Sequence, residues 1–139
     1  MLANGATLAY KEHGGAGSYT DLPGLKEIPE IGADPEKVEN TVLTDTLKQY
    51  EMGIGDPGDM TYKFKYENTS ASSSYRLLRT AQASGNAYDF KETDKDGTTI
   101  TFTAYPSVKR GGGGVNGVID FDLNLALASE ITITDPSAA

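Results

Sequence analysis

The strongest constraint on the fold is an alternation of apolar and polar residues with a period of two. Two segments, MTYKFKY (60–66) and VIDFDLNLAL (118–127), carry apolar or aromatic side chains at every second position. Their intervening polar positions are Thr61, Lys63, Lys65, Asp120, Asp122 and Asn124. This spacing is typical of a β-strand with one buried and one wet face, so it predicts a sheet that covers a core on one side.

Further strands follow from the same period and from turn residues. The runs TTITFTAY (98–105) and ITIT (131–134) alternate in the same way, and weaker strand patterns occupy residues 6–11, 18–28, 36–44 and 46–52. The turn DKDG (94–97) contains an Asp-Gly step, which supplies the positive φ of a tight hairpin. The sequence therefore predicts eight or nine strands, with a hairpin at residues 94–97.

One segment has a helical period instead. Residues 73–84 place Tyr75, Leu78 and Ala81 on one helical face, after a run of serines and before Gly85-Asn86. Serine favours the N-cap of a helix and glycine its C-terminal end. The resulting fold class is mainly β, an antiparallel β-sandwich or partly rolled barrel with one short flanking α-helix at about 73–84.

Length and composition limit the organisation of the chain. With 139 residues and no cysteine, the sequence predicts a single domain over 1–139 without disulfides. The run RGGGG (110–114) is expected to be a flexible glycine loop. The formal charge of −8 opposes binding to a phosphate backbone, which argues against a sequence-reading nucleic-acid binder.

Residues with catalytic or ligand-binding chemistry are scarce. His13 is the only histidine and lies beside two glycines. Gly112, Gly114 and Gly117 match G-x-G-x-x-G, but a strand rather than a helix is expected after them. Asp94 and Asp96 begin like a calcium loop that lacks its glycine and its final glutamate. We therefore predict no enzyme activity, catalytic residue, cofactor or metal site.

The order of the motifs resembles that of the major tail tube proteins of long-tailed, siphovirus-type bacteriophages. The matching features are LPGLKEIPEIG, EKVENTVLTD, LKQYEMGIGDPGDM leading into TYKFKYEN, a helix with YRLL, a YDFKE hairpin and the closing VNGVIDFDLNLALASEI. The resemblance implies a structural virion protein that self-assembles into stacked hexameric rings, the conduit for DNA ejection into the host. It also implies a location in the virion tail, with assembly in the host cytoplasm.

The resemblance assigns roles to two groups of residues. The segment 45–59 takes the place of a projecting hairpin or loop, with Leu47, Tyr50, Met52 and Ile54 as contacts between subunits and rings. The polar positions Thr61, Lys63, Lys65, Asp120, Asp122 and Asn124 are candidates to face the lumen. The implied partners are copies of the chain, a tape-measure protein and tail terminator or tail-tip proteins; double-stranded DNA passes through without specific binding, and no membrane is involved.

Two other functions are compatible with these patterns. The ring-forming tube proteins of type VI secretion and of contractile tails resemble this fold and also build hexameric rings. A monomeric β-sandwich binding module would share the strands but remain monomeric at high concentration.

Overall fold

The computed structural model describes residues 1–15, 17–31, 34–39, 50–56 and 59–136. Within them are ten strands and one helix: β1 (Thr7–Glu12), β2 (Thr20–Leu22), β3 (Leu25–Glu27), β4 (Asp34–Glu39), β5 (Tyr50–Asp56), β6 (Asp59–Lys65), α1 (Ser74–Ser84), β7 (Tyr88–Thr93), β8 (Thr99–Arg110), β9 (Asp120–Leu127) and β10 (Thr132–Thr134). The expected mainly β fold with one short helix is confirmed. None of the helical residues described forms a helix long and apolar enough to cross a membrane.

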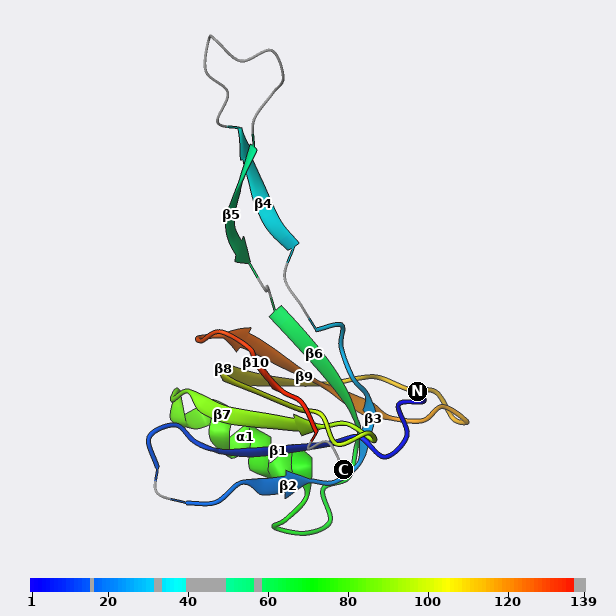
Figure 1. The fold of residues 1–139 in the computed structure, drawn as a ribbon. Coiled ribbons are helices and arrows are strands. Elements are labelled where there is room, and N and C mark those ends of the chain that lie inside the picture. Colours follow the sequence, from blue (N-terminus) through cyan, green and yellow to red (C-terminus); the bar gives the residue numbers. More distant parts are fainter. Residues whose placement is uncertain (16, 32–33, 40–49, 57–58, 137–139) are drawn as a thin grey trace, which may run out of the picture.

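Eight of the strands form one antiparallel sheet, which is not closed (Figure 1). Its order is β2-β1-β7-β8-β9-β6-β3, and β10 pairs with β8 at Thr99–Thr101, beyond the stretch of β8 that pairs with β9. The short strands β2 and β3 are the two ends of this order. The remaining strands, β4 and β5, form a two-stranded sheet of their own.

The period of two determines which side of the sheet is buried. In β6, Met60, Tyr62 and Phe64 are buried, whereas the alternate positions Thr61 and Lys65 are exposed. The apolar positions of β8 and β9 behave in the same way. The predicted alternation in these strands is therefore confirmed, and the aromatic residues of the apolar face form the centre of the core.

The sheet is rolled, and one buried hydrogen bond demonstrates it. Strands β6 and β7 are separated in the sheet by β8 and β9, yet the Tyr62 hydroxyl donates to Glu92 Oε1 at 2.8 Å. Two strands that far apart meet only if their common face is concave. The right-handed twist of neighbouring strands accounts for this curvature.

Helix α1 covers the apolar face of the sheet, where it packs against β8. Leu78 and Ala81 are buried, and Gly85 ends the helix with a left-handed φ of 71°. The bounds confirm the predicted helix. The expected serine cap is wrong in detail, because Ser73 makes no side-chain cap and instead accepts a hydrogen bond from the Ser70 amide at 3.2 Å.

Two turns decide how the predicted strand segments divide. The β7–β8 hairpin is confirmed, with Gly97 at φ 95° and the Asp94 amide donating to the Thr98 carbonyl. The predicted strand 18–28 is instead two strands, β2 and β3, with Pro23-Gly24 between them. Proline removes a backbone donor, and Gly24 has φ 87°, so the ladder is interrupted there.

Strands β4 and β5 project from the body of the subunit (Figure 1). They are antiparallel, with Glu39 opposite Tyr50 and Lys37 opposite Met52. Both strands differ from the expected bounds of 36–44 and 46–52, and residues 40–49 lie outside the described residues. The projecting sheet therefore includes β4, which precedes the predicted segment 45–59.

Candidate assembly surfaces

The six candidate lumen positions lie together on adjacent strands of the sheet. Strand register pairs Thr61 with Asn124, Lys63 with Asp122, and Lys65 with Asp120. The Thr61 hydroxyl donates to Asn124 Oδ1 at 2.7 Å. The structure thus brings the residues into three cross-strand pairs on the polar face of β6 and β9. Their place in a lumen stays a prediction.

One ion pair forms at the edge of this face. Lys26, the middle residue of the edge strand β3, donates to both carboxylate oxygens of Asp120 at 3.0 Å. Strand β8 adds Lys109 opposite Asp122 and Ser107 opposite Asn124. Sequence analysis missed these two residues, although the alternation of Ser107, Val108 and Lys109 after Pro106 was a usable signal.

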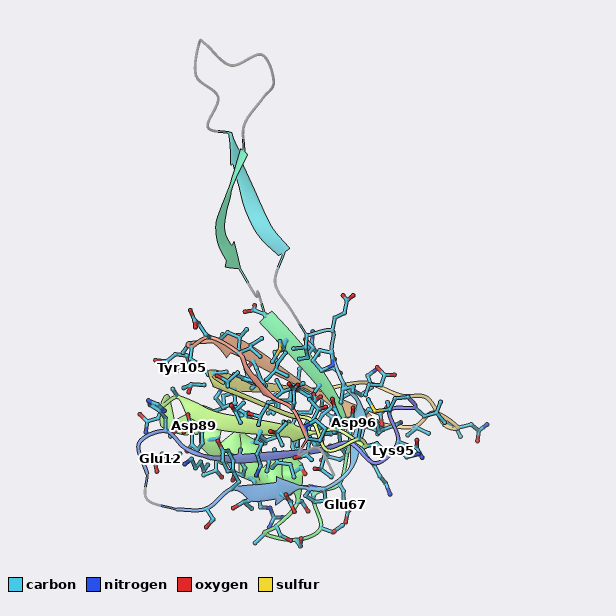
Figure 2. The ribbon with its side chains drawn as sticks, in the orientation of Figure 1. Glu12, Glu67, Asp89, Lys95, Asp96 and Tyr105 are labelled. Atoms are coloured by element: carbon cyan, nitrogen blue, oxygen red, sulfur yellow. The ribbon has the colours of Figure 1, made fainter. Side chains whose placement is uncertain are left out.

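The polar face continues across β7 and β1. Asp89 of β7, labelled in Figure 2, lies there beside His13, which follows β1. Asp89 Oδ1 accepts from the Thr103 hydroxyl at 2.6 Å and lies 2.8 Å from His13 Nδ1. Partial burial opposes the charged form, but the two hydrogen bonds, together with the charges of His13 and Lys11, lower the pKa of Asp89. Nearby, Lys91 and Lys11 lie over the ring of Tyr19, 4.8 and 5.1 Å from its centroid.

Three of the four predicted apolar contact residues lie in the projecting two-stranded sheet. Tyr50, Met52 and Ile54 belong to β5, whereas Leu47 lies outside the described residues. Their role between subunits stays a prediction, as does the flexibility of the glycine loop 110–114.

The motifs that hint at chemistry have structural explanations. Asp96 Oδ1 accepts from the Thr98 amide at 3.0 Å, which stabilises the β7–β8 turn. The glycine motif lies between β8 and β9, so no helix follows it. Across the described ranges, no group of three or more His, Cys, Asp or Glu residues is arranged to hold a metal ion.

A buried acidic residue was missed by sequence analysis. Glu92 is 1% exposed, and it accepts the hydrogen bond from Tyr62 described above. Burial, together with neighbouring Asp94, raises the pKa of Glu92 to about 7, although the bond from Tyr62 favours the charged form. The only signal in the sequence was its position, two residues after Phe90 on the apolar face of β7.

The described residues thus form a rolled, open sheet with one helix and a projecting hairpin, and solved subunits of phage-like tails share this fold. The chain is similar to a subunit in the tail of an empty gene transfer agent particle with C6 symmetry, with TM-score 0.68 and 19% identity over 93% of this chain and 96% of that one. It is also similar to the SPP1 tail tube, with TM-score 0.62 and 14% identity over 94% and 77%. A chain of the anti-feeding prophage baseplate has TM-score 0.63 and 13% identity over 93% and 91%. These likenesses show the shared fold.

Sequence comparison identifies the family. Residues 1–138 match the family model described as phage tail tube, TTP, lambda-like. The chain belongs to this family, and it is a structural protein of the virion tail. No curated protein matches it by sequence.

Proposed function

We propose that the chain assembles into hexameric rings that stack into a tube, the conduit through which DNA leaves the virion. Membership of the tail tube family supports the tube. The similar gene transfer agent tail was solved with C6 symmetry, which supports six subunits per ring. Residues 1–139 act as one domain, and the protein's work is geometric rather than enzymatic.

The polar face of β6, β9 and β8 lines the lumen. The observation that carries this assignment is the cross-strand pairing of Lys63 with Asp122 beside the ion pair of Lys26 with Asp120. Asp120 and Asp122 offset part of the attraction of the neighbouring lysines for DNA, while the overall charge of −8 suppresses adhesion. Double-stranded DNA therefore slides past without specific binding.

The projecting hairpin makes contacts between subunits and rings. Two-stranded sheets are marginally stable alone in water, so β4 and β5 need a partner surface. Leu47, Tyr50, Met52 and Ile54 supply apolar area to that contact. Assembly also involves a tape-measure protein inside the tube and tail terminator or tail-tip proteins at its ends.

A second candidate is a tube of a contractile or type VI secretion machine. The likeness to a chain of the anti-feeding prophage baseplate favours it. The match to a lambda-like family over nearly the whole chain favours the phage tail instead.

Negative-stain electron microscopy of the purified protein tests the proposal. We expect stacked rings or tubes at high protein concentration, with light scattering that increases with concentration. A protein that remains monomeric at millimolar concentration would contradict the proposal and favour a binding module.

A further inference from the structure

All three arginines of the chain gather on one surface. Arg76 and Arg79 come from α1, and Arg110 ends β8. All three side chains are exposed. The other nine basic residues are lysines, so the surface differs in kind from the polar face of the sheet.

Two tyrosines connect Arg79 and Arg110. The Arg79 guanidinium lies 5.3 Å from the ring centroid of Tyr75, and Arg110 lies 5.6 Å from that of Tyr66. The two rings meet edge to face at 4.9 Å. Arginine and tyrosine are enriched in the central residues of protein interfaces, and this stacking restrains both arginines before any partner binds.

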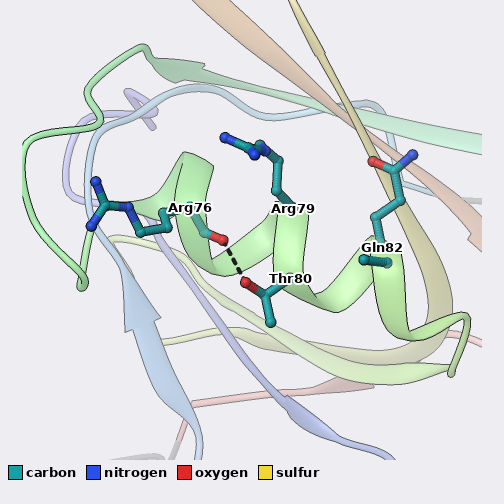
Figure 3. Close-up of a pocket in the computed structure, with 5 residues that line it drawn as sticks. Arg76, Arg79, Thr80 and Gln82 are labelled. Atoms are coloured by element: carbon teal, nitrogen blue, oxygen red, sulfur yellow. Dashed lines mark hydrogen bonds between the residues drawn. The ribbon is translucent and has the colours of Figure 1, made fainter.

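A groove of about 480 Å³ runs along the exposed side of α1, lined by Arg76, Arg79, Thr80, Gln82 and Ala83 (Figure 3). Arg76 donates to the side chain and carbonyl of Asn68, at 2.9 and 3.2 Å. Within the described ranges, none of the three arginines forms an ion pair with a carboxylate. The groove therefore presents guanidinium groups to an external anionic partner.

This surface lies on the side of the sheet opposite to the polar face. Leu78 of α1 belongs to the core cluster of the apolar face, so the helix and its arginines lie beyond that core. If the polar face lines the lumen, DNA in the lumen does not reach the arginines. A protein partner fits this position better than a nucleic acid does.

The chain itself contains an acidic segment that could bind this surface, the strands β4 and β5. Strands β4 and β5 contain five acidic residues and one basic residue, a net charge of −4. These strands pair with each other in a separate sheet and project away from α1 (Figure 1). The arginine surface of the same subunit lies on its body, and the two strands project away from it. A second copy of the chain is therefore the partner that matches both charge and geometry.

We propose that the arginine surface, comprising Arg76, Arg79 and Arg110, receives the acidic β4–β5 hairpin of a neighbouring copy. This inference rests on the proposed function, and it names the partner surface on each subunit. The pairing orients neighbouring subunits, and the two tyrosines provide the apolar part of the contact.

A charge exchange tests the pairing. We would prepare R76E/R79E, the neutral R76Q/R79Q, the hairpin variant E36K/E39K, and a chain that combines R76E/R79E with E36K/E39K. Lys95→Glu, in the exposed β7–β8 turn, is the matched charge-reversal control. Circular dichroism confirms folding, and light scattering with electron microscopy measures the lowest concentration at which tubes form.

We expect R76E/R79E and E36K/E39K each to raise that concentration by about tenfold or more, R76Q/R79Q to raise it less, and the combined chain to recover most of the loss. Lys95→Glu should assemble like the original chain.

Normal assembly of the arginine variants, or no recovery in the folded combined chain, would overturn the pairing. Normal assembly with lost binding of a short DNA duplex would overturn it and assign the surface to nucleic acid. Failure of the unmodified chain to assemble would instead contradict the proposed function.

Discussion

At the scale of single residues, Glu92 makes the core sensitive to pH. A carboxyl group that is buried in the folded protein but hydrated in the unfolded chain ionises more easily when the protein unfolds. The pKa of Glu92 in the folded state is about 7, above its ordinary value of 4.5. Its contribution to stability is therefore fully present below about pH 4.5 and is lost as pH rises through about 7.

We expect the variant Glu92→Gln to remove most of this pH dependence. Its amide oxygen still accepts from the Tyr62 hydroxyl but carries no charge to desolvate. Between about pH 5 and 8, the free energy of unfolding of the original chain should fall by up to about 3 kcal/mol relative to the variant. Urea unfolding, at protein concentrations below those at which tubes form, measures the free energy of unfolding of both proteins.

Glu12→Gln is the matched control, because Glu12 is exposed at the end of β1. This variant should retain the pH dependence of the original chain. Equal pH profiles for Glu92→Gln and the original chain would show that Glu92 ionises without cost.

At the scale of elements, the hairpin β4–β5 is separable from the sheet that contains the core. Its strands pair with each other, whereas the other eight form the rolled sheet. Because Glu39 and Tyr50 are register partners, a two-residue turn can replace the residues between them. Asn-Gly suits such a turn, since both residues accept positive φ.

We predict that joining Glu39 to Tyr50 through Asn-Gly leaves a folded subunit that no longer forms tubes. The core residues of the described sheet are untouched, but residues 40–49, which include the proposed contact residue Leu47, are removed. The free energy of unfolding should change by no more than about 0.5 kcal/mol, the usual size of changes at the surface. Normal tubes in the electron microscope would exclude an essential role for the hairpin tip.

At the scale of the whole molecule, the rolled sheet separates an inner apolar face from an outer polar face. The absence of cysteine from the chain allows a single introduced thiol to report on the polar face. Lys65 is exposed in the subunit and lies opposite Asp120. It is therefore a suitable position for the reporter.

We expect Lys65→Cys to react with maleimides of any size in the free subunit. In assembled tubes, a small maleimide should still react. A polymer-linked maleimide enters only at the tube ends, so it should react at least about tenfold more slowly than with the free subunit. A fast reaction with the large reagent would place Lys65 outside the tube. Protection from both reagents would place it in a subunit interface.

The sequence determined the strand faces, the β7–β8 turn and the single helix, because period two, Asp-Gly chemistry and period 3.6 are local properties. The sequence also indicated the polar positions of β6 and β9, since the alternation is visible in each strand, but not the register that pairs them. Tertiary structure alone decided that β6 curls over to β7, that Glu92 is buried beneath Tyr62, and that Arg76, Arg79 and Arg110 share a surface. Those relations depend on the order and twist of strands distant in sequence, and no local pattern encodes them.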